Sequence, residues 1–185
     1  MISVNDLRTG LTIQIDNDVF SVVEFLHVKP GKGAAFVRTK LKNARTGAVQ
    51  EKTFRGGEKV ERAHIETKQM QYLYSNDDEY FFMDVATFDQ ISLMRDELGE
   101  APKYLLENMT IGIQFFQERA IGMDLPTTVN LKITETEPGF RGDTATGATK
   151  LAKLETGISV HVPLFIEQGE VVKVDTRSGE YLSRA

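Results

Sequence analysis

The residues best suited to chemistry lie in one short glycine-rich segment, Lys29-Pro30-Gly31-Lys32-Gly33. Pro30 has a fixed φ and favours extended backbone before it, whereas Gly31 and Gly33 permit positive φ on either side of Lys32. Since apolar-rich segments flank this stretch, the pattern predicts a tight hairpin with Lys32 at its tip. A lysine in that position can extend its free amine into a partner molecule.

Cations recur at alternate positions in the segment that follows, at Arg38, Lys40 and Lys42. Alternate side chains of a strand share one face, so these three cations form a basic stripe that leads to the loop. Val37 and Leu41 lie on the other face and are expected to pack into a barrel. A basic stripe binds the phosphate backbone of nucleic acid without sequence preference, and such binding weakens as salt is added.

Other reactive groups do not form recognisable sites. The three histidines, His27, His64 and His161, are far apart and lack carboxylates at ligand spacing, so we expect no metal and no cofactor. There is no cysteine, which excludes disulfides and thiolate chemistry. The acids of Asp77-Asp78-Glu79 are interpreted as a solvated turn. Ser and Thr residues have no His or Asp partners at triad spacing, so acyl transfer is unsupported.

The aromatic pairs of the sequence are more typical of packing than of base stacking. We interpret Phe81-Phe82 and Phe115-Phe116 as core and rim residues. The glycine-rich loop is also no phosphate-cradling loop, because that motif requires Gly-Lys-Ser/Thr at the start of a helix.

Charge is distributed unevenly over the 185 residues, whose net charge is −5. Residues 1–63 hold 11 Lys and Arg against 7 Asp and Glu, residues 64–127 hold 4 against 12, and residues 128–185 hold 7 against 8. The first third is therefore basic and the middle third strongly acidic, which favours an anionic partner for the N-terminal part.

Short β-strands separated by turns are expected almost throughout. The predicted strands are 11–15, 19–26, 34–41, 49–54, 71–74, 80–83, 110–117, 128–134 and 171–175. One helix is expected near Ala101–Asn108, with Pro102 in its first turn, and a second short helical piece around Thr87–Leu98.

Two boundaries, at Gly56–Thr67 and Leu125–Thr127, divide the chain into three parts. We place the domains at residues 1–64, 65–127 and 128–185. Pieces of about 60 residues suit compact barrels, and the last two resemble OB-type barrels, whose common use is contact with nucleic acid. The fold class is therefore all-β, with three small barrels in a row.

Several motifs together resemble the elongation factor P family of bacteria. The resemblance spans the whole length and rests on five segments in the family's order: Asp6–Leu11, His27–Phe36, Glu51–Phe54, Thr134–Ala145 and Val162–Arg184.

The resemblance implies a fold and a function. The expected fold is an SH3-like, KOW-like N-terminal barrel followed by two OB barrels, in an elongated, L-shaped, tRNA-like arrangement. The expected function is binding to both ribosomal subunits beside the P-site peptidyl-tRNA and promotion of peptide-bond formation at stalled polyproline stretches. Lys32 would position the tRNA acceptor end and receive a modification from a separate enzyme. Gly142, Asp143 and Thr144 would lie near the small subunit and the exit-site codon.

Three alternatives stay open. The first is the elongation-factor-P-like paralogue, and the second is a general single-strand-binding OB protein, against which the net charge and the scarcity of exposed aromatics weigh. The third is an enzyme that uses Lys32 as a Schiff-base nucleophile, which requires a desolvated lysine. The preferred interpretation is a non-enzymatic, monomeric protein. It is expected to be cytoplasmic, because no apolar run approaches the roughly 20 residues that span a membrane.

Overall fold

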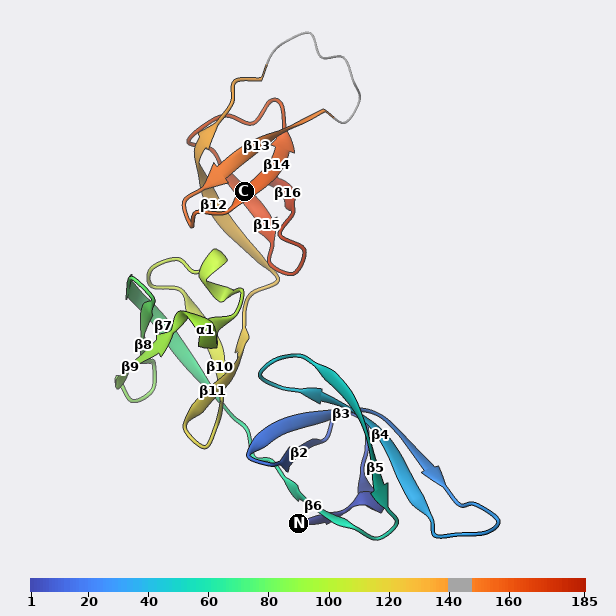
Figure 1. Cartoon of the computed structure of the whole chain (residues 1–185). Coiled ribbons are helices and arrows are strands. Elements are labelled where there is room, and N and C mark those ends of the chain that lie inside the picture. Colours follow the sequence, from blue (N-terminus) through green and yellow to red (C-terminus); the bar gives the residue numbers. More distant parts are fainter. Residues whose placement is uncertain (140–147) are drawn as a thin grey trace. The chain divides into compact units, whose positions relative to one another are not determined.

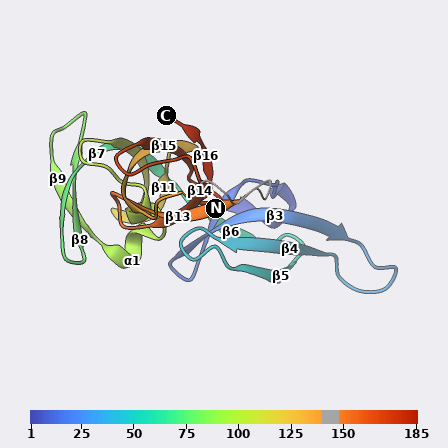
Figure 2. The ribbon, with the colours of Figure 1, turned by 90° about the horizontal axis from the view of Figure 1, so that it is seen from above.

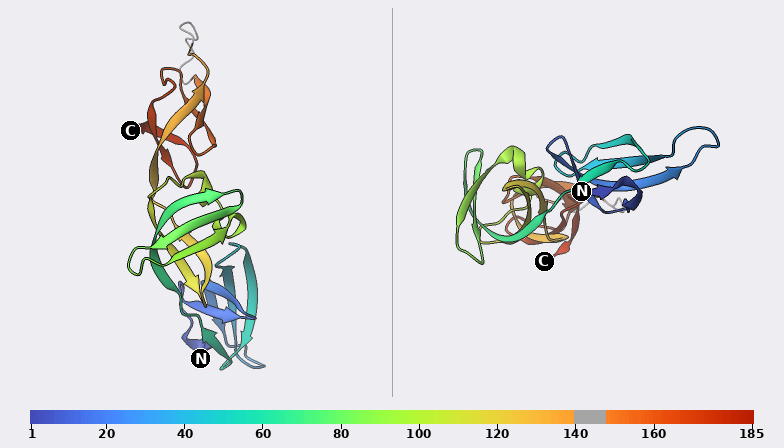
Figure 3. Two further views of the ribbon diagram at one scale, coloured as in Figure 1. Left: turned by 90° about the vertical axis from the view of Figure 1, so that its left-hand side faces the viewer. Right: turned by 90° about the horizontal axis from the view of Figure 1, so that it is seen from below.

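The computed structural model describes residues 1–139 and 148–185, and these residues form three β-sheets (Figure 1). The all-β fold class is thereby confirmed. Met1–Lys68 and Ile113–Gly122 form one compact unit, and Gln69–Gly112 and Met123–Ala185 form a second. Each sheet curls on itself, as the separate views in Figure 3 show.

The first sheet has six strands in the order β1-β6-β2-β3-β4-β5. Its strands are β1 (Ile2–Ser3), β2 (Thr12–Ile15), β3 (Asp18–Val28), β4 (Phe36–Asn43), β5 (Val49–Arg55) and β6 (Lys59–Arg62), with a 3-10 helix, η1 (Val4–Asp6), after β1. Strands β2 and β3 meet at a two-residue turn in which Asp16 and Asn17 both have positive φ (48° and 69°), the geometry that matches strand twist. Nine buried apolar residues fill the core of this sheet, among them Leu7, Ile13 and Leu41.

The second sheet has the order β11-β10-β7-β8-β9. Its elements are β7 (Glu66–Asn76), β8 (Glu79–Asp84), β9 (Gln90–Met94), α1 (Arg95–Leu98), η2 (Ala101–Lys103), β10 (Thr110–Phe116) and β11 (Arg119–Asp124).

The helix expected over Ala101–Asn108 is wrong beyond Lys103. Only η2 forms there, and Asn108 adopts a left-handed φ of 67° while its N–H donates to the carbonyl of Tyr72. The N–H of Tyr72 in turn donates to the carbonyl of Met109. This segment therefore pairs with β7 instead of continuing a helix, because tertiary pairing outweighs local propensity.

The third sheet has the order β14-β13-β12-β15-β16. Its strands are β12 (Thr128–Thr136), β13 (Thr149–Leu154), β14 (Ser159–Pro163), β15 (Val171–Asp175) and β16 (Tyr181–Arg184). The buried side chains alternate along β13 and β14, and Tyr104 from the segment after η2 joins their core.

All nine predicted strands are present, but seven others were not expected: β1, β6, β9, β11, β13, β14 and β16. Each of these seven strands has two to six residues. In the described part of the chain, no helix combines the length and the apolar character needed to cross a membrane.

Candidate nucleic-acid interface

The loop that carries Lys32 joins the long strands β3 and β4 at their free end (Figures 1 and 2). The last cross-strand pair before the loop is Val28 with Phe36. All seven residues between them, 29–35, are exposed. Lys32 thus stands at the tip as expected, but the loop is longer than the tight hairpin predicted, and β4 begins at Phe36 and not at Ala34.

Only one of the two glycines beside Lys32 uses a left-handed backbone. Both glycines permit positive φ, but only Gly33 adopts it, at +117°, whereas Gly31 does not. A Cβ at Gly33 would lie 3.7 Å from Cγ of Pro30, an ordinary contact. Gly33 therefore permits the turn through its backbone conformation and not through a close approach.

A glycine that lies outside the loop contacts the last loop residue. The N–H of Gly56, in the turn after β5, donates to the carbonyl of Ala35 at 2.8 Å. A Cβ on Gly56 would lie 2.9 Å from that same oxygen and 3.2 Å from Cβ of Ala35. The β5–β6 turn thus abuts the last loop residue so closely that only glycine fits.

Strand β4 shows the alternation that the sequence predicts. Val37, Thr39 and Leu41 are buried, and Arg38 and Lys42 are exposed. Thr39 completes its hydrogen bonding by donating to the carbonyl of Lys52 at 2.7 Å. The three cations therefore share the outer face of the sheet.

Lys40 differs from the other two cations because it is paired. Its Nζ lies 2.8 Å from Oε2 of Glu24 on β3, and Glu51 is its cross-strand neighbour on β5. The hydrogen bond and the charge of Glu24 raise the pKa of Lys40, and Glu51 adds to the shift. The basic stripe is consequently interrupted at its middle position.

The other residues singled out in the sequence occupy structural positions. Phe82, Phe115 and Phe116 are buried, and the ring of Phe81 stacks on Tyr74 with centroids 4.6 Å apart. His27 packs edge-on against Phe25. Within the described residues, no group of three or more His, Cys, Asp or Glu side chains is arranged to hold a metal ion.

Gly142, Asp143 and Thr144 lie outside the described residues. The segment before them is anchored at Glu137, whose carbonyl accepts a hydrogen bond of 2.7 Å from the buried amine of Lys150. A lysine that is 7% exposed and bonded to a backbone carbonyl serves to fix the chain locally.

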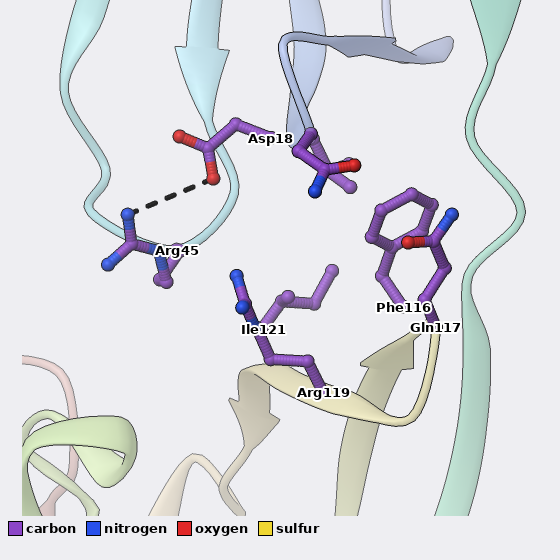
Figure 4. A pocket seen from close by; sticks show the side chains of 8 residues that line it. Asp18, Arg45, Phe116, Gln117, Arg119 and Ile121 are labelled. Atoms are coloured by element: carbon purple, nitrogen blue, oxygen red, sulfur yellow. Dashed lines mark ion pairs between the residues drawn. The ribbon is translucent and has the colours of Figure 1, made fainter.

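A pocket in the first unit lies at the opposite end of β3 from the Lys32 loop (Figure 4). The labelled residues that line it are Asp18, Arg45, Phe116, Gln117, Arg119 and Ile121. Arg45 and Asp18 approach to 3.8 Å across it. Beneath it, Phe116 and Ile121 of the β10–β11 hairpin are buried against Val19 and Ala63. This pocket therefore lies where the β10–β11 hairpin packs against the first sheet.

The fold of this chain is similar to that of solved structures, among them two translation factors. A eukaryotic translation initiation factor 5A from Methanococcus jannaschii has a TM-score of 0.51 and 24% identity, over 65% of this chain and 86% of that one. A translation initiation factor 5A family protein from Naegleria fowleri has a TM-score of 0.55 and 14% identity, over 67% of this chain and 96% of that one. At these identities the likeness concerns the fold alone.

Sequence comparison defines the family within this class. Residues 3–60 match the elongation factor P KOW-like domain, residues 65–123 its OB domain and residues 129–184 its C-terminal domain. Elongation factor P of Moorella thermoacetica is 63% identical and that of Symbiobacterium thermophilum 62%, each over the full length of both chains. The chain belongs to the elongation factor P family, and it is a translation elongation factor.

Sequence reasoning did not single out Glu24 or Arg55, both of which bear on this interface. Arg55 lies directly opposite Phe36, the first residue of β4. The turn at Thr46-Gly47 offered a signal, since counting outwards from a hairpin turn gives the register of β4 and β5. For Glu24 no such signal existed, because a bulge between Val22 and Glu24 shifts the pairing of β3 with β4.

Proposed function

We propose that this factor binds the ribosome beside the P-site peptidyl-tRNA and promotes peptide-bond formation at polyproline stretches, with Lys32 steadying the tRNA acceptor end. The observation that carries the proposal is the exposed seven-residue loop, which presents Lys32 at the free end of two long paired strands. Membership of the elongation factor P family supports ribosome binding.

The proposed role suits the chemistry of proline. Its ring fixes φ and makes its nitrogen a secondary amine, so proline is poorly placed both as donor and as acceptor in peptide-bond formation. Holding the donor in an attack geometry lowers the barrier through orientation and entropy. Lys32 therefore acts by positioning, and the ribosome performs the chemistry. A Schiff-base role is disfavoured because the exposed loop provides no desolvated pocket for the amine.

The remaining residues have supporting roles in this proposal. Lys29, Pro30, Gly31 and Gly33 shape the tip loop, and Arg38 and Lys42 contact the phosphate backbone of tRNA or rRNA. Lys40, which is paired with Glu24, contributes little net charge to that contact. Gly142, Asp143 and Thr144 approach the small subunit near the exit-site codon. The domains that carry these residues are 1–64, 65–127 and 128–185.

Lys32 is also proposed as the target of a modifying enzyme. Lys32 is exposed, as are all its neighbours in the loop, so an added group would lengthen its reach without displacing the fold. Peptide mapping of protein purified from its own host should reveal a mass increment on the Lys32 peptide. An entirely unmodified peptide would remove this step from the proposal.

Replacement of Lys32 by Ala tests the function directly. Lys32→Ala should abolish rescue of a reporter that contains a proline run, because the positioning group is lost. The melting temperature should change little, since an exposed loop residue contributes little to stability. Lys59→Ala, which removes another exposed lysine of the same sheet, is the matched control and should rescue normally. Normal rescue by Lys32→Ala would overturn the proposal.

A further inference from the structure

The turn between β15 and β16 is a part of the third sheet to which the proposed function gives no role. The turn is held together by its own hydrogen bonds. Oδ1 of Asp175 accepts the N–H groups of Arg177 at 2.7 Å and Ser178 at 3.0 Å, and the carbonyl of Asp175 accepts the N–H of Gly179 at 2.9 Å. These bonds give the Asp175–Gly179 turn a defined shape before anything packs against it.

Tyr104 reaches this turn from another part of the chain. It directly follows η2, which belongs to the second sheet's part of the chain, yet its side chain is 5% exposed and lies in the core of the third sheet. A Cβ at Gly179 would lie 3.2 Å from Oη of Tyr104. The absence of a side chain at Gly179 therefore leaves room for the hydroxyl of Tyr104.

The same turn also holds the connection between the second and third sheets. The hydroxyl of Thr176 donates to the carbonyls of Pro126 at 2.5 Å and Thr127 at 3.1 Å, and the N–H of Thr176 donates to the carbonyl of Thr127 at 3.0 Å. Pro126 and Thr127 lie between β11 and β12. The turn thus contacts two points that are far apart in the sequence, so a rotation about the connection must break one of these contacts.

A fixed arrangement of two sheets matters when both contact one large partner. Once one surface is bound, the second binds at an effective concentration that falls when the joint between them is loose. A joint that is ordered by folding also removes an ordering cost from the binding step. Such a joint therefore raises affinity for the partner and leaves the chemistry at the bound site unchanged.

We infer that Tyr104 is a positioning residue, whose contact with the Asp175–Gly179 turn holds the second and third sheets in one arrangement for ribosome binding. This inference rests on the proposed function, in which the factor reaches both the tRNA acceptor end and the small subunit. Tyr104 acts on affinity, whereas Lys32 acts on the bound tRNA.

The joint is tested by the distance between labels on the two sheets. The chain has no cysteine, so Ser92→Cys on β9 and Lys153→Cys on β13, both exposed positions, can carry the only two spin labels. Pulsed electron spin resonance should give a narrow distance distribution with Tyr104 present and a broad one after Tyr104→Ala. Leu131→Ala is the control, since it removes a buried side chain of the same core from within the third sheet and should leave the distribution narrow.

Gly179→Ala tests the contact without removing a core side chain. The new Cβ would press on the hydroxyl of Tyr104, and alanine is strained at the φ of +75°. Gly157→Ala is the matched control, because Gly157, between β13 and β14, has a φ of +95° but nothing within 4 Å of its Cβ position. Both variants carry backbone strain, but only Gly179→Ala should broaden the distribution. This pair carries the structural test if circular dichroism shows that Tyr104→Ala is unfolded.

The effect on function is measured by titrating each unlabelled full-length variant into in vitro translation of the proline-run reporter. Tyr104→Ala should raise the concentration for half-maximal rescue by about tenfold, and Gly179→Ala should raise it several-fold, with rescue at saturation unchanged. Gly157→Ala should titrate like the parent protein. Lys32→Ala should fail at every concentration, because it removes the positioning amine and not the joint.

The inference is overturned if the distribution stays narrow in folded Tyr104→Ala or in Gly179→Ala, or if Leu131→Ala or Gly157→Ala broadens it equally. An unchanged half-maximal concentration in Gly179→Ala also overturns it. Lys32→Ala separates this inference from the proposed function. If only the joint is wrong, Lys32→Ala still fails while Gly179→Ala titrates like the parent protein. If the function is wrong, Lys32→Ala rescues the reporter although the distance distributions still distinguish the variants.

Discussion

Individual charges in this protein differ mainly in what surrounds them. Lys32 and Arg38 are exposed and have no ion-pair partner among the described residues, whereas Lys40 shares its charge with Glu24 at 2.8 Å. Asp175, at the end of β15, is held by its own turn: its Oδ1 accepts the N–H groups of Ser178 at 3.0 Å and Arg177 at 2.7 Å. Unpaired charges are available to partners, and paired charges mainly organise the fold.

Asp175 should make part of the stability depend on pH. The N–H groups of Ser178 and Arg177 lower the pKa of Asp175 below its ordinary value of 3.8, because they favour the carboxylate. This stabilisation is fully present above pH 3.8 and is lost as the pH falls through the lower, folded-state pKa. At pH 7 the parent protein should therefore have a higher melting temperature than Asp175→Asn. In strong acid the two melting temperatures should become equal. If the difference in melting temperature is unchanged in acid, the charge of Asp175 does not contribute to stability.

At the scale of elements, the Lys32 loop depends on a strand turn that lies outside it. The hairpin of β3 and β4 carries the loop at its end. The contact of Gly56 with Ala35 fixes the position at which the chain leaves the loop and enters β4. The loop is therefore a product of three strands and not of its own glycines alone.

Gly56→Ala should impair the loop without unfolding the sheet. The new Cβ would lie 2.9 Å from the carbonyl oxygen of Ala35, so Ala35 must shift, at a cost of about 1–3 kcal/mol. Rescue of the proline-run reporter should fall several-fold while circular dichroism still shows a folded protein. Gly57→Asn is the control, because Gly57 has open space around it and asparagine tolerates its φ of +83°. Normal activity in Gly56→Ala would mean that this contact does not position the loop.

At the scale of the whole molecule, the compact units do not coincide with the sequence segments that match the family models. The OB-domain match covers residues 65–123, yet Ile113–Gly122 belongs to the same compact unit as Met1–Lys68. Phe116 and Ile121 at this hairpin end are buried with Val19 and Ala63. The N-terminal sheet thus completes its packing with residues from a later part of the chain.

Ile121→Ala should therefore destabilise the N-terminal sheet. Loss of this buried side chain, which is 7% exposed, should cost about 2–4 kcal/mol in urea unfolding. Hydrogen exchange should quicken at the amides of Ala44 and Ala63, which bond to Val19 and Thr12. Ile166→Ala, a buried isoleucine of the other unit, should cost as much but leave these amides protected. Equal loss of protection in both variants would contradict the assignment of the hairpin to the first unit.

The sequence by itself determined those features that depend on residues close together in the chain. Period-two alternation gave the face of β4 that carries Arg38 and Lys42, and the glycine-rich segment gave the exposed position of Lys32. Both follow from backbone geometry over a few residues, which any sequence displays directly. The all-β class and the family followed from the same local motifs, repeated along the chain.

Only the tertiary structure decided what depends on pairing between distant segments. The neutralisation of Lys40 by Glu24 depends on a bulge in β3, and the end of the helix at Lys103 depends on pairing between Tyr72 and Asn108. The contact of Gly56 with Ala35 likewise joins residues of different hairpins. Register and close approach are set by the packing of the whole unit, so no local pattern encodes them.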